Sequence, residues 1–125
     1  MAQRMTDEEY RGFMLDRART AVLATVRADG SPHTAPSWFD LDGDTLIFTT
    51  GESTVKGRNM RRDPRISFCI EEEESPFHFV VIEGSSTPTA GDPDLLYWAT
   101  RIGGRYMGPG RAEEYGSRNA VEVSC

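Results

Sequence analysis

Residues 49–65 read TTGESTVKGRNMRRDPR, and this stretch decides how the rest of the chain is interpreted. It follows an apolar run typical of a strand and predicts a short helix over 53–62, and its last ten residues contain five cations. The N-terminus of a helix offers unpaired backbone N–H groups and the positive end of the helix dipole, which attract anions. With the hydroxyls of Ser53 and Thr54 beside it, the stretch predicts a phosphate site. A solvated basic helix face is the alternative.

The remaining composition is acidic, with a net charge of −6 over 125 residues. Such a chain lacks the dominant positive field that non-specific nucleic-acid binding requires. No run approaches the roughly 20 apolar residues of a membrane-spanning helix, and the first residues lack the apolar core of a signal peptide. Two cysteines cannot form a dense disulfide framework. We therefore expect one domain, 1–125, in the reducing cytoplasm, with Cys69 as a buried thiol.

Alternating apolar residues and turn signals predict antiparallel strands. The prolines of the second strand place it at a sheet edge or a bulge, because proline cannot donate to a ladder. Gly84 in the last long strand suggests a bulge, and the four glutamates of 71–74 predict a solvated loop. The first three strands should form a meander through the turns at Asp29-Gly30 and 42–44. The expected strands cover 20–27, 32–41, 45–50, 65–71 and 77–87.

Helix signals stand at both ends of the chain. Thr6 and Glu9 form the pattern of a capping box and predict a helix over 7–18. Asp92 followed by proline predicts another helix start, with Asp92 as N-cap. The apolar stripe of that helix includes Trp98, and the glycines at 103 and 104 predict its end. A loop over 105–110, one or two helical turns over 111–117 and a closing strand over 121–123 should follow.

Many antiparallel strands with few short helices predict a mainly β, α+β fold. A small β-barrel is the expected architecture, because closing the sheet removes exposed edges. The proline-containing strand and the aromatic residues also suit a dimer interface. Trp98 is expected in the core. Trp38 is expected in the core, at a dimer interface or in a pocket wall.

Four stretches of the chain resemble a known group of proteins. They are similar to the split β-barrel flavin- and deazaflavin-binding proteins, the pyridoxamine-phosphate-oxidase-like superfamily. Within it, the resemblance is to the coenzyme F420-dependent oxidoreductases of actinobacteria. The stretches are TAVLATVRADGSPHTAPSWF (20–39), LIFTTGESTVKGRNMRRDPRISF (46–68), VVIEGSST (80–87) and IGGRYMGPGRAEEYGSRN (102–119).

The resemblance implies an FMN-binding-protein-like split barrel with flanking short helices. It also implies a homodimer whose two cofactor sites lie in clefts between the subunits. The cofactor phosphate and ribityl chain would contact Thr49, Thr50, Ser53, Lys56 and Asn59, with Arg58 and Arg61 as charge partners. The ring would lie beside Pro36, Ser37 and Trp38, and Arg105, Tyr106 and Met107 would close the site from the other subunit.

The function that the resemblance implies is hydride transfer from reduced coenzyme F420 to an unsaturated small molecule. In such proteins the cofactor carries the chemistry and the protein supplies position and electrostatics. Consistent with this, the chain shows no nucleophilic triad and no metal-ligand cluster, and His33 and His78 stand alone as ordinary strand residues. No catalytic acid is assigned. The alternatives are an FMN-dependent oxidoreductase of the same fold and a deazaflavin carrier without turnover. The acidic run 71–74 is expected to point away from the polyglutamate tail of the cofactor, which would lie near Arg58, Arg61 or Arg105.

Overall fold

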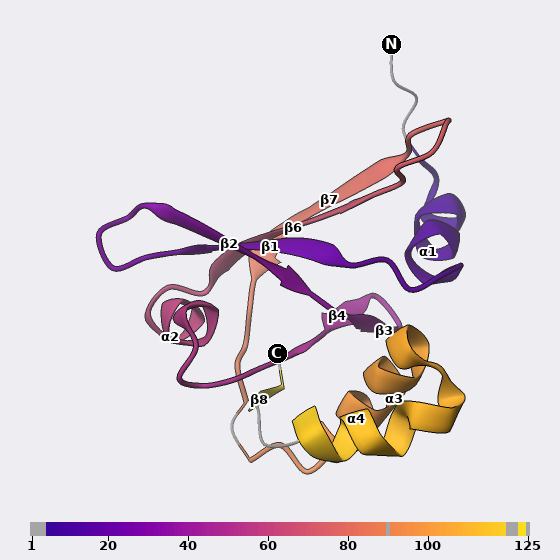
Figure 1. The fold of residues 1–125 in the computed structure, drawn as a ribbon. Coiled ribbons are helices and arrows are strands. Elements are labelled where there is room, and N and C mark those ends of the chain that lie inside the picture. Colours follow the sequence, from indigo (N-terminus) through magenta and orange to yellow (C-terminus); the bar gives the residue numbers. More distant parts are fainter. Residues whose placement is uncertain (1–4, 90, 120–122, 125) are drawn as a thin grey trace.

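The main sheet is antiparallel, with four strands in the order β2-β1-β6-β7 (Figure 1). A computed structural model describes residues 5–89, 91–119 and 123–124. The proline-containing β2 (Pro32–Ser37) lies at one edge, as predicted, and β7 (Phe79–Ser85) lies at the other. Between them, β1 (Ala21–Val26) and β6 (Arg65–Glu71) carry most of the buried side chains of the sheet.

The expected three-stranded meander is wrong, because the second and third segments each divide. β3 (Asp40–Asp42) pairs with β4 (Thr45–Ile47) in a separate ladder, and β5 (Thr49–Thr50) pairs with β8 (Val123–Ser124). The chain leaves the main sheet at Trp38, and the N–H of Phe39 donates to the Tyr106 hydroxyl at 3.2 Å. A side chain from a distant helix therefore replaces a strand partner. The closing strand exists at Val123, while 121–122 lie outside the described residues.

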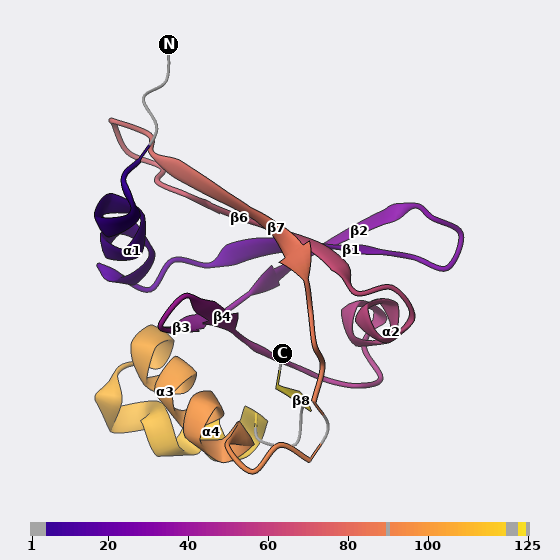
Figure 2. The ribbon, with the colours of Figure 1, turned by 180° about the vertical axis from the view of Figure 1, so that it is seen from behind.

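The β6–β7 hairpin forms a long arm (Figure 2) and corrects two sequence predictions. Its register runs without interruption from Arg65 opposite Ser85 to Glu71 opposite Phe79, so Gly84 does not mark a bulge. The acidic run after β6 is not uniformly solvated either. The Glu72 carboxylate binds Arg17 and accepts a 2.6 Å hydrogen bond from Arg19. The side chains of Glu72 and Arg19 are only 14% and 9% exposed.

The first two helices follow their local signals. α1 (Asp7–Leu15) begins with the predicted capping box: the Thr6 hydroxyl accepts from the Glu9 N–H, and the Glu9 carboxylate accepts from the Thr6 N–H, both at 3.1 Å. It ends earlier than the expected residue 18. α2 (Val55–Arg62) begins after Thr54 and ends at Asp63, as the following proline predicts.

The tail departs from the sequence prediction. α3 (Leu95–Met107) begins two residues after Pro93, because the Asp92 carboxylate accepts from the Asp94 N–H in a preceding turn. It also runs through Gly103 and Gly104, so the predicted loop at 105–107 is wrong. The 3-10 turn η1 (Pro109–Arg111) and α4 (Ala112–Asn119) then bring the chain back along α3 (Figures 1 and 2).

Glycine permits this helical return. A Cβ built at Gly103 would lie 2.8 Å from the Tyr115 Cβ, and one at Gly104 would lie 3.1 Å from the Ala112 Cβ. A Cβ at Gly116 would lie 2.8 Å from the Thr100 Cα. These glycines are points of close approach between α3 and α4 rather than helix terminators.

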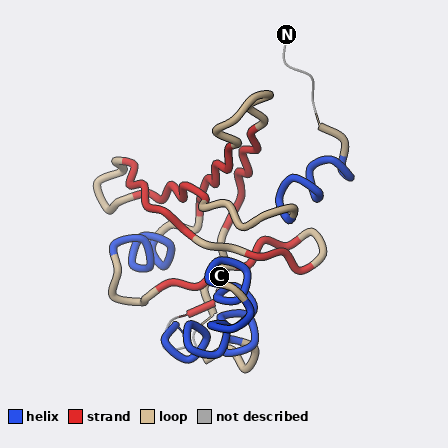
Figure 3. Tube along the Cα trace, turned by 45° about the vertical axis from the view of Figure 1, so that its right-hand side comes forward, coloured by secondary structure: helices blue, strands red, loops and turns tan. Residues whose placement is uncertain are grey.

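The core lies on the inner face of the main sheet. Leu23 and Phe68 are fully buried there, with Phe39 contributed by the β2–β3 connection and Phe48 by the residue between β4 and β5. The opposite face remains open in the single chain, since Val22 is 49%, Phe79 60% and Val81 50% exposed. The sheet therefore has one packed and one accessible side. The strands and helices are separated by colour in Figure 3.

Candidate cofactor cleft

A cleft of about 220 Å³ lies where strand ends and helix ends converge. β2 contributes Pro36 and Ser37, followed directly by Trp38, and β5 contributes Thr49. Lys56 reaches the cleft from the first turn of α2. These residues are separated in the sequence, and the structure brings them together as the sequence analysis expected. Ile102 of α3 and Asn119 of α4 complete the lining.

The start of α2 is folded tightly onto the preceding loop. The Thr54 hydroxyl accepts from the Gly57 N–H at 3.1 Å and donates to the Gly51 carbonyl at 2.6 Å. A Cβ at Gly57 would lie 2.2 Å from the Gly51 carbonyl oxygen, so only glycine fits this turn. The Thr54 hydroxyl therefore serves the helix cap and is not the free ligand donor that the sequence analysis expected. Ser53 lies exposed in the same turn.

One wall of the cleft is held in place by aromatic stacking. Trp38 stacks on Tyr106 with ring centroids 4.8 Å apart and planes 5° from parallel. The Tyr106 hydroxyl donates to the Arg19 carbonyl at 2.6 Å and accepts from the Phe39 N–H. Burial raises the pKa of Tyr106, which keeps its hydroxyl neutral and able to donate. Trp38 is thus a supported wall residue, one of the three roles considered from the sequence.

Several residues with predicted cofactor contacts lie outside the cleft lining. Thr50 and Asn59 are 1% and 3% exposed, and the Asn59 amide donates to the Thr25 hydroxyl at 3.0 Å, joining α2 to β1. On the outer side of α2, Arg58 is exposed and Arg61 binds Glu52 at 2.6 Å. Their proposed contacts with a cofactor remain predictions.

The predicted closing residues occupy the end of α3. Arg105 lies 3.5 Å from the buried carboxylate of Asp40, and Tyr106 packs beneath Trp38 of its own chain. Met107 is half-buried at the last position of α3. These three residues are helical rather than part of the predicted loop, and their contact with a cofactor in a partner subunit stays a prediction.

Sequence reasoning missed two lining residues. Ile102 is 3% exposed and is one of the buried residues of α3, so its sequence position is that of an ordinary core residue. Asn119 reaches the cleft because α4 returns along α3, and no local motif encodes that return. The only sequence feature related to this return is the presence of glycines in both helices, at 103 and 104 in α3 and at 116 in α4.

The cleft can bind and orient a ligand, but it offers little acid–base chemistry. Lys56 is the cation among the lining residues, and the described lining includes no carboxylate and no imidazole. Within 5–89, 91–119 and 123–124, no three His, Cys, Asp or Glu side chains gather closely enough to hold a metal ion. In that same part of the chain, none of the helices is both long and apolar enough to span a bilayer.

Antiparallel sheets, short flanking helices and a cleft at the strand ends define the split-barrel class of α+β folds. The family model of pyridoxamine 5'-phosphate oxidase matches residues 6–124. The chain therefore belongs to the pyridoxamine 5'-phosphate oxidase family, and the fold and family expected from the sequence are confirmed.

Solved structures agree with this assignment. A conserved hypothetical protein from Mycobacterium tuberculosis is 26% identical with a TM-score of 0.84, and the match covers 99% of this chain and 82% of the other. An F420 reductase is 28% identical with a TM-score of 0.74, over 90% and 87% of the two chains. The heme storage protein HutZ from Vibrio cholerae is 19% identical with a TM-score of 0.73, over 97% and 87%, and supports the fold alone.

Proposed function

We propose that this protein is a coenzyme F420-dependent oxidoreductase that transfers a hydride to an unsaturated small molecule. The observation that carries the proposal is the cleft that Lys56 lines together with the segment 36–38. Family membership supports a cofactor-binding, oxidoreductase-like role, and the similarity to an F420 reductase supports the deazaflavin. The free thiol of Cys69 is compatible with a reducing cytoplasmic setting.

The residues of the cleft fit a flat ring that carries a phosphate. Trp38, supported by Tyr106, provides a rigid aromatic wall, and Pro36 adds apolar surface beside it. The Lys56 ammonium suits a phosphate, with the Thr49 hydroxyl as a further donor. When bound, the deazaflavin supplies the hydride. The chain itself binds, orients and shields the reacting groups from water.

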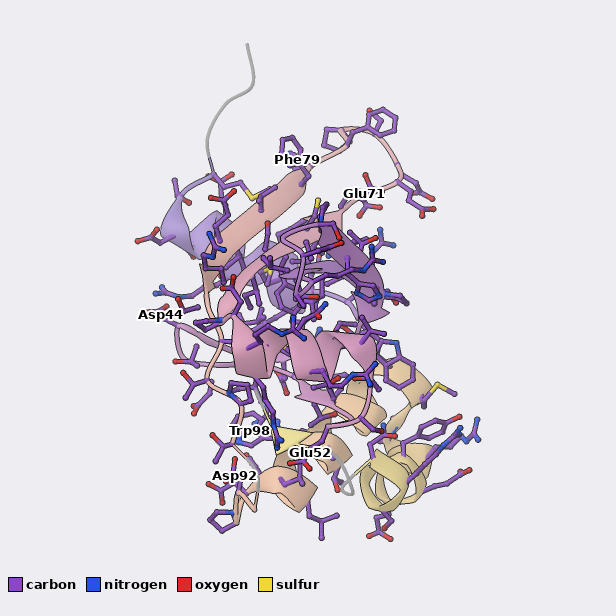
Figure 4. The ribbon with its side chains drawn as sticks, turned by 90° about the vertical axis from the view of Figure 1, so that its left-hand side faces the viewer. Asp44, Glu52, Glu71, Phe79, Asp92 and Trp98 are labelled. Carbon is purple, nitrogen blue, oxygen red and sulfur yellow. The ribbon has the colours of Figure 1, made fainter. Side chains whose placement is uncertain are left out.

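A second copy of the chain would complete this site. Pockets for drug-sized ligands commonly enclose roughly 300–1,000 Å³, whereas the cleft of one chain encloses about 220 Å³. The open sheet face around Val22 and Val81 offers apolar surface for a homodimer. The acidic run would not obstruct the cleft of its own chain, because Figure 4 shows Glu71 on the arm, well apart from Glu52, which precedes α2 in the sequence.

The lining also motivates the alternatives. Since no carboxylate or imidazole is found among the described lining residues, solvent would supply the proton after hydride transfer, or the protein would carry the cofactor without turnover. FMN remains the alternative cofactor, because the ring wall and the ammonium fit either group.

Fluorescence titrations with oxidised F420 and, in parallel, with FMN test the proposal. Saturable preference for F420 supports it, and oxidation of the reduced coenzyme by a panel of enones and quinones separates a reductase from a carrier. Preference for FMN would support the alternative, an FMN-dependent oxidoreductase of the same fold. Binding of neither would overturn the proposed function while leaving the fold intact.

The Lys56→Ala variant tests the placement of the phosphate. Loss of a hydrogen bond to a charged group typically costs about 1.5–3 kcal/mol, so the Kd for F420 should rise roughly 10- to 100-fold. Arg27→Ala is the matched control, because it removes one positive charge from the exposed β1–β2 turn, away from the cleft. Equal affinities of the Lys56 variant and the wild type would remove Lys56 from the site.

A further inference from the structure

A second, larger cavity lies beside α3, away from the cleft. It encloses about 370 Å³, and its lining includes Arg17, Leu41, Arg101 and Arg105. Positions 101 and 105 lie one turn apart on a single helix face, whereas Ile102, which lines the cleft, points about 100° away from position 101 and about 60° away from position 105. The cavity and the cleft therefore use different faces of α3.

The charges around this cavity do not cancel. Asp40 is the carboxylate in the lining and is only 2% exposed. One of its oxygens accepts from the Arg101 Nε at 3.1 Å, and the other lies 3.5 Å from an Arg105 nitrogen. Arg17 is bound by Glu72, which lies outside the lining. Glu72 also binds Arg19, which pairs with Asp16, so four guanidinium groups share three carboxylates, and one positive charge remains in a protein whose net charge is −6.

The guanidinium groups also retain unused donors. The Arg105 side chain is 18% exposed, yet its hydrogen bond to the Met14 carbonyl is long at 3.4 Å. Its buried Nε has no hydrogen-bond partner among the described residues. Buried guanidinium donors are normally paired, because leaving them unpaired costs free energy. Arg105 is held mainly by Asp40 and by its position 5.2 Å from the centre of the Phe39 ring.

We propose that this cavity binds a small organic oxyanion, through a carboxylate or a phosphate group. The planar fork of arginine can donate two parallel hydrogen bonds to either group, and two arginines of α3 line the cavity. Leu15 and Leu41 line the same space and provide apolar contact for the carbon part of the ligand. The volume lies within the range of small-molecule pockets. The proposal does not depend on cofactor binding in the cleft.

Calorimetric titration of the full chain with citrate and with inorganic phosphate tests the proposal, at constant ionic strength maintained with sodium chloride and without cofactor. We expect saturable binding of at least one of the two anions. Stronger binding of citrate would identify a carboxylate site, and stronger binding of phosphate would identify a phosphate site. Absence of saturable binding by both anions would overturn the proposal.

Three variants locate the bound anion. Arg101→Gln should raise the Kd at least tenfold; Arg101 is 49% exposed, so the substitution should leave the fold intact. Arg111→Gln is the matched control, because Arg111 is also 49% exposed and also binds a carboxylate at 3.1 Å, but lies outside the cavity. Lys56→Ala should leave anion affinity unchanged. Equal weakening by the two arginine variants, or loss of binding in the Lys56 variant, would overturn the proposed location.

Discussion

The α2 segment and the α3–α4 tail both contain glycines at close contacts, but the sequence reveals only one of the two structures. In the α2 segment, every signal is local. Thr54 caps the helix, Gly57 lets the first turn approach the Gly51 carbonyl, and Asp63 ends it before a proline. A reader of the sequence needs only about fifteen neighbouring residues to place the helix correctly.

In the tail, the same residue type has the opposite meaning. Gly103 and Gly104 resemble a helix terminus, yet they lie inside α3 at its contact with α4. Glycine costs about 1 kcal/mol relative to alanine in a helix interior, so its presence there requires compensation from packing. The comparison teaches that glycine ends a helix where nothing packs against it and permits a close crossing where another helix does.

Gly116→Ala should give the largest effect of the predictions that follow. The new Cβ would lie 2.1 Å from the Thr100 hydroxyl oxygen and 2.8 Å from the Thr100 Cα, so α4 must move away from α3. Overpacking of this kind typically costs roughly 1–3 kcal/mol. Urea unfolding should therefore show a lower free energy of unfolding, and affinity for the cleft ligand should fall because Asn119 moves with α4.

Gly12→Ala provides the matched control for that substitution. Gly12 also lies in a helix, but a Cβ there has no neighbour within 4 Å. The higher helix propensity of alanine should raise the free energy of unfolding by up to about 1 kcal/mol. Stabilisation by both substitutions would show that the tail glycines are not packing contacts.

Thr54→Ala tests the helix cap of the α2 segment and should lower the free energy of unfolding less than Gly116→Ala does. It removes the hydroxyl that accepts from the Gly57 N–H. Loss of such an N-cap should lower the free energy of unfolding by about 1 kcal/mol in urea titrations. Thr54→Ser retains the hydroxyl and should behave like the wild type. If serine were as damaging as alanine, the methyl group rather than the cap would be responsible.

The difference between local signals and contacts of distant segments also explains how much of the fold could be predicted. The capping box at Thr6, the edge position of β2 and the whole of β6 follow from residues close in sequence. The break of the second strand near Phe39 could not be predicted, because it depends on the Tyr106 hydroxyl, 67 residues away. Local sequence patterns show which secondary structure a segment favours. Contacts with residues distant in sequence, such as Tyr106, determine where a strand ends in the folded chain.

The candidate site follows this rule as well. The resemblance to the family implies a common site for Pro36, Ser37, Trp38, Thr49 and Lys56, and these five do line one cleft, where the end of β2, β5 and the start of α2 meet. Ile102 and Asn119 were missed, because they reach the cleft through the α3–α4 crossing. The second cavity itself was not predicted, because Arg17 and Arg105 come together only in the folded chain.

Glu72→Gln should lower the free energy of unfolding at neutral pH, and this difference from the wild type should disappear in acid. Hydrogen bonds from Arg19, aided by Arg17, lower the pKa of Glu72 from 4.5 to about 2. A carboxyl group whose pKa is lowered on folding stabilises the protein above its unfolded-state pKa, and this contribution is lost as the pH falls through the folded-state value. The stability advantage of the wild type over Glu72→Gln should therefore decline between about pH 4.5 and pH 2.

Unfolding free energies measured from pH 2 to pH 7 check this third prediction. Glu73→Gln is the control, because it removes the same charge from the exposed neighbouring residue and should preserve the acid dependence of the wild type. Asp63, whose hydrogen bonds from Arg65 also lower its pKa to about 2, titrates in all three proteins and cancels in the comparison. Parallel curves for the Glu72 variant and the wild type would show that the long-range pair with Arg19 contributes nothing. The acidic run would then be the solvated loop that its local sequence predicts.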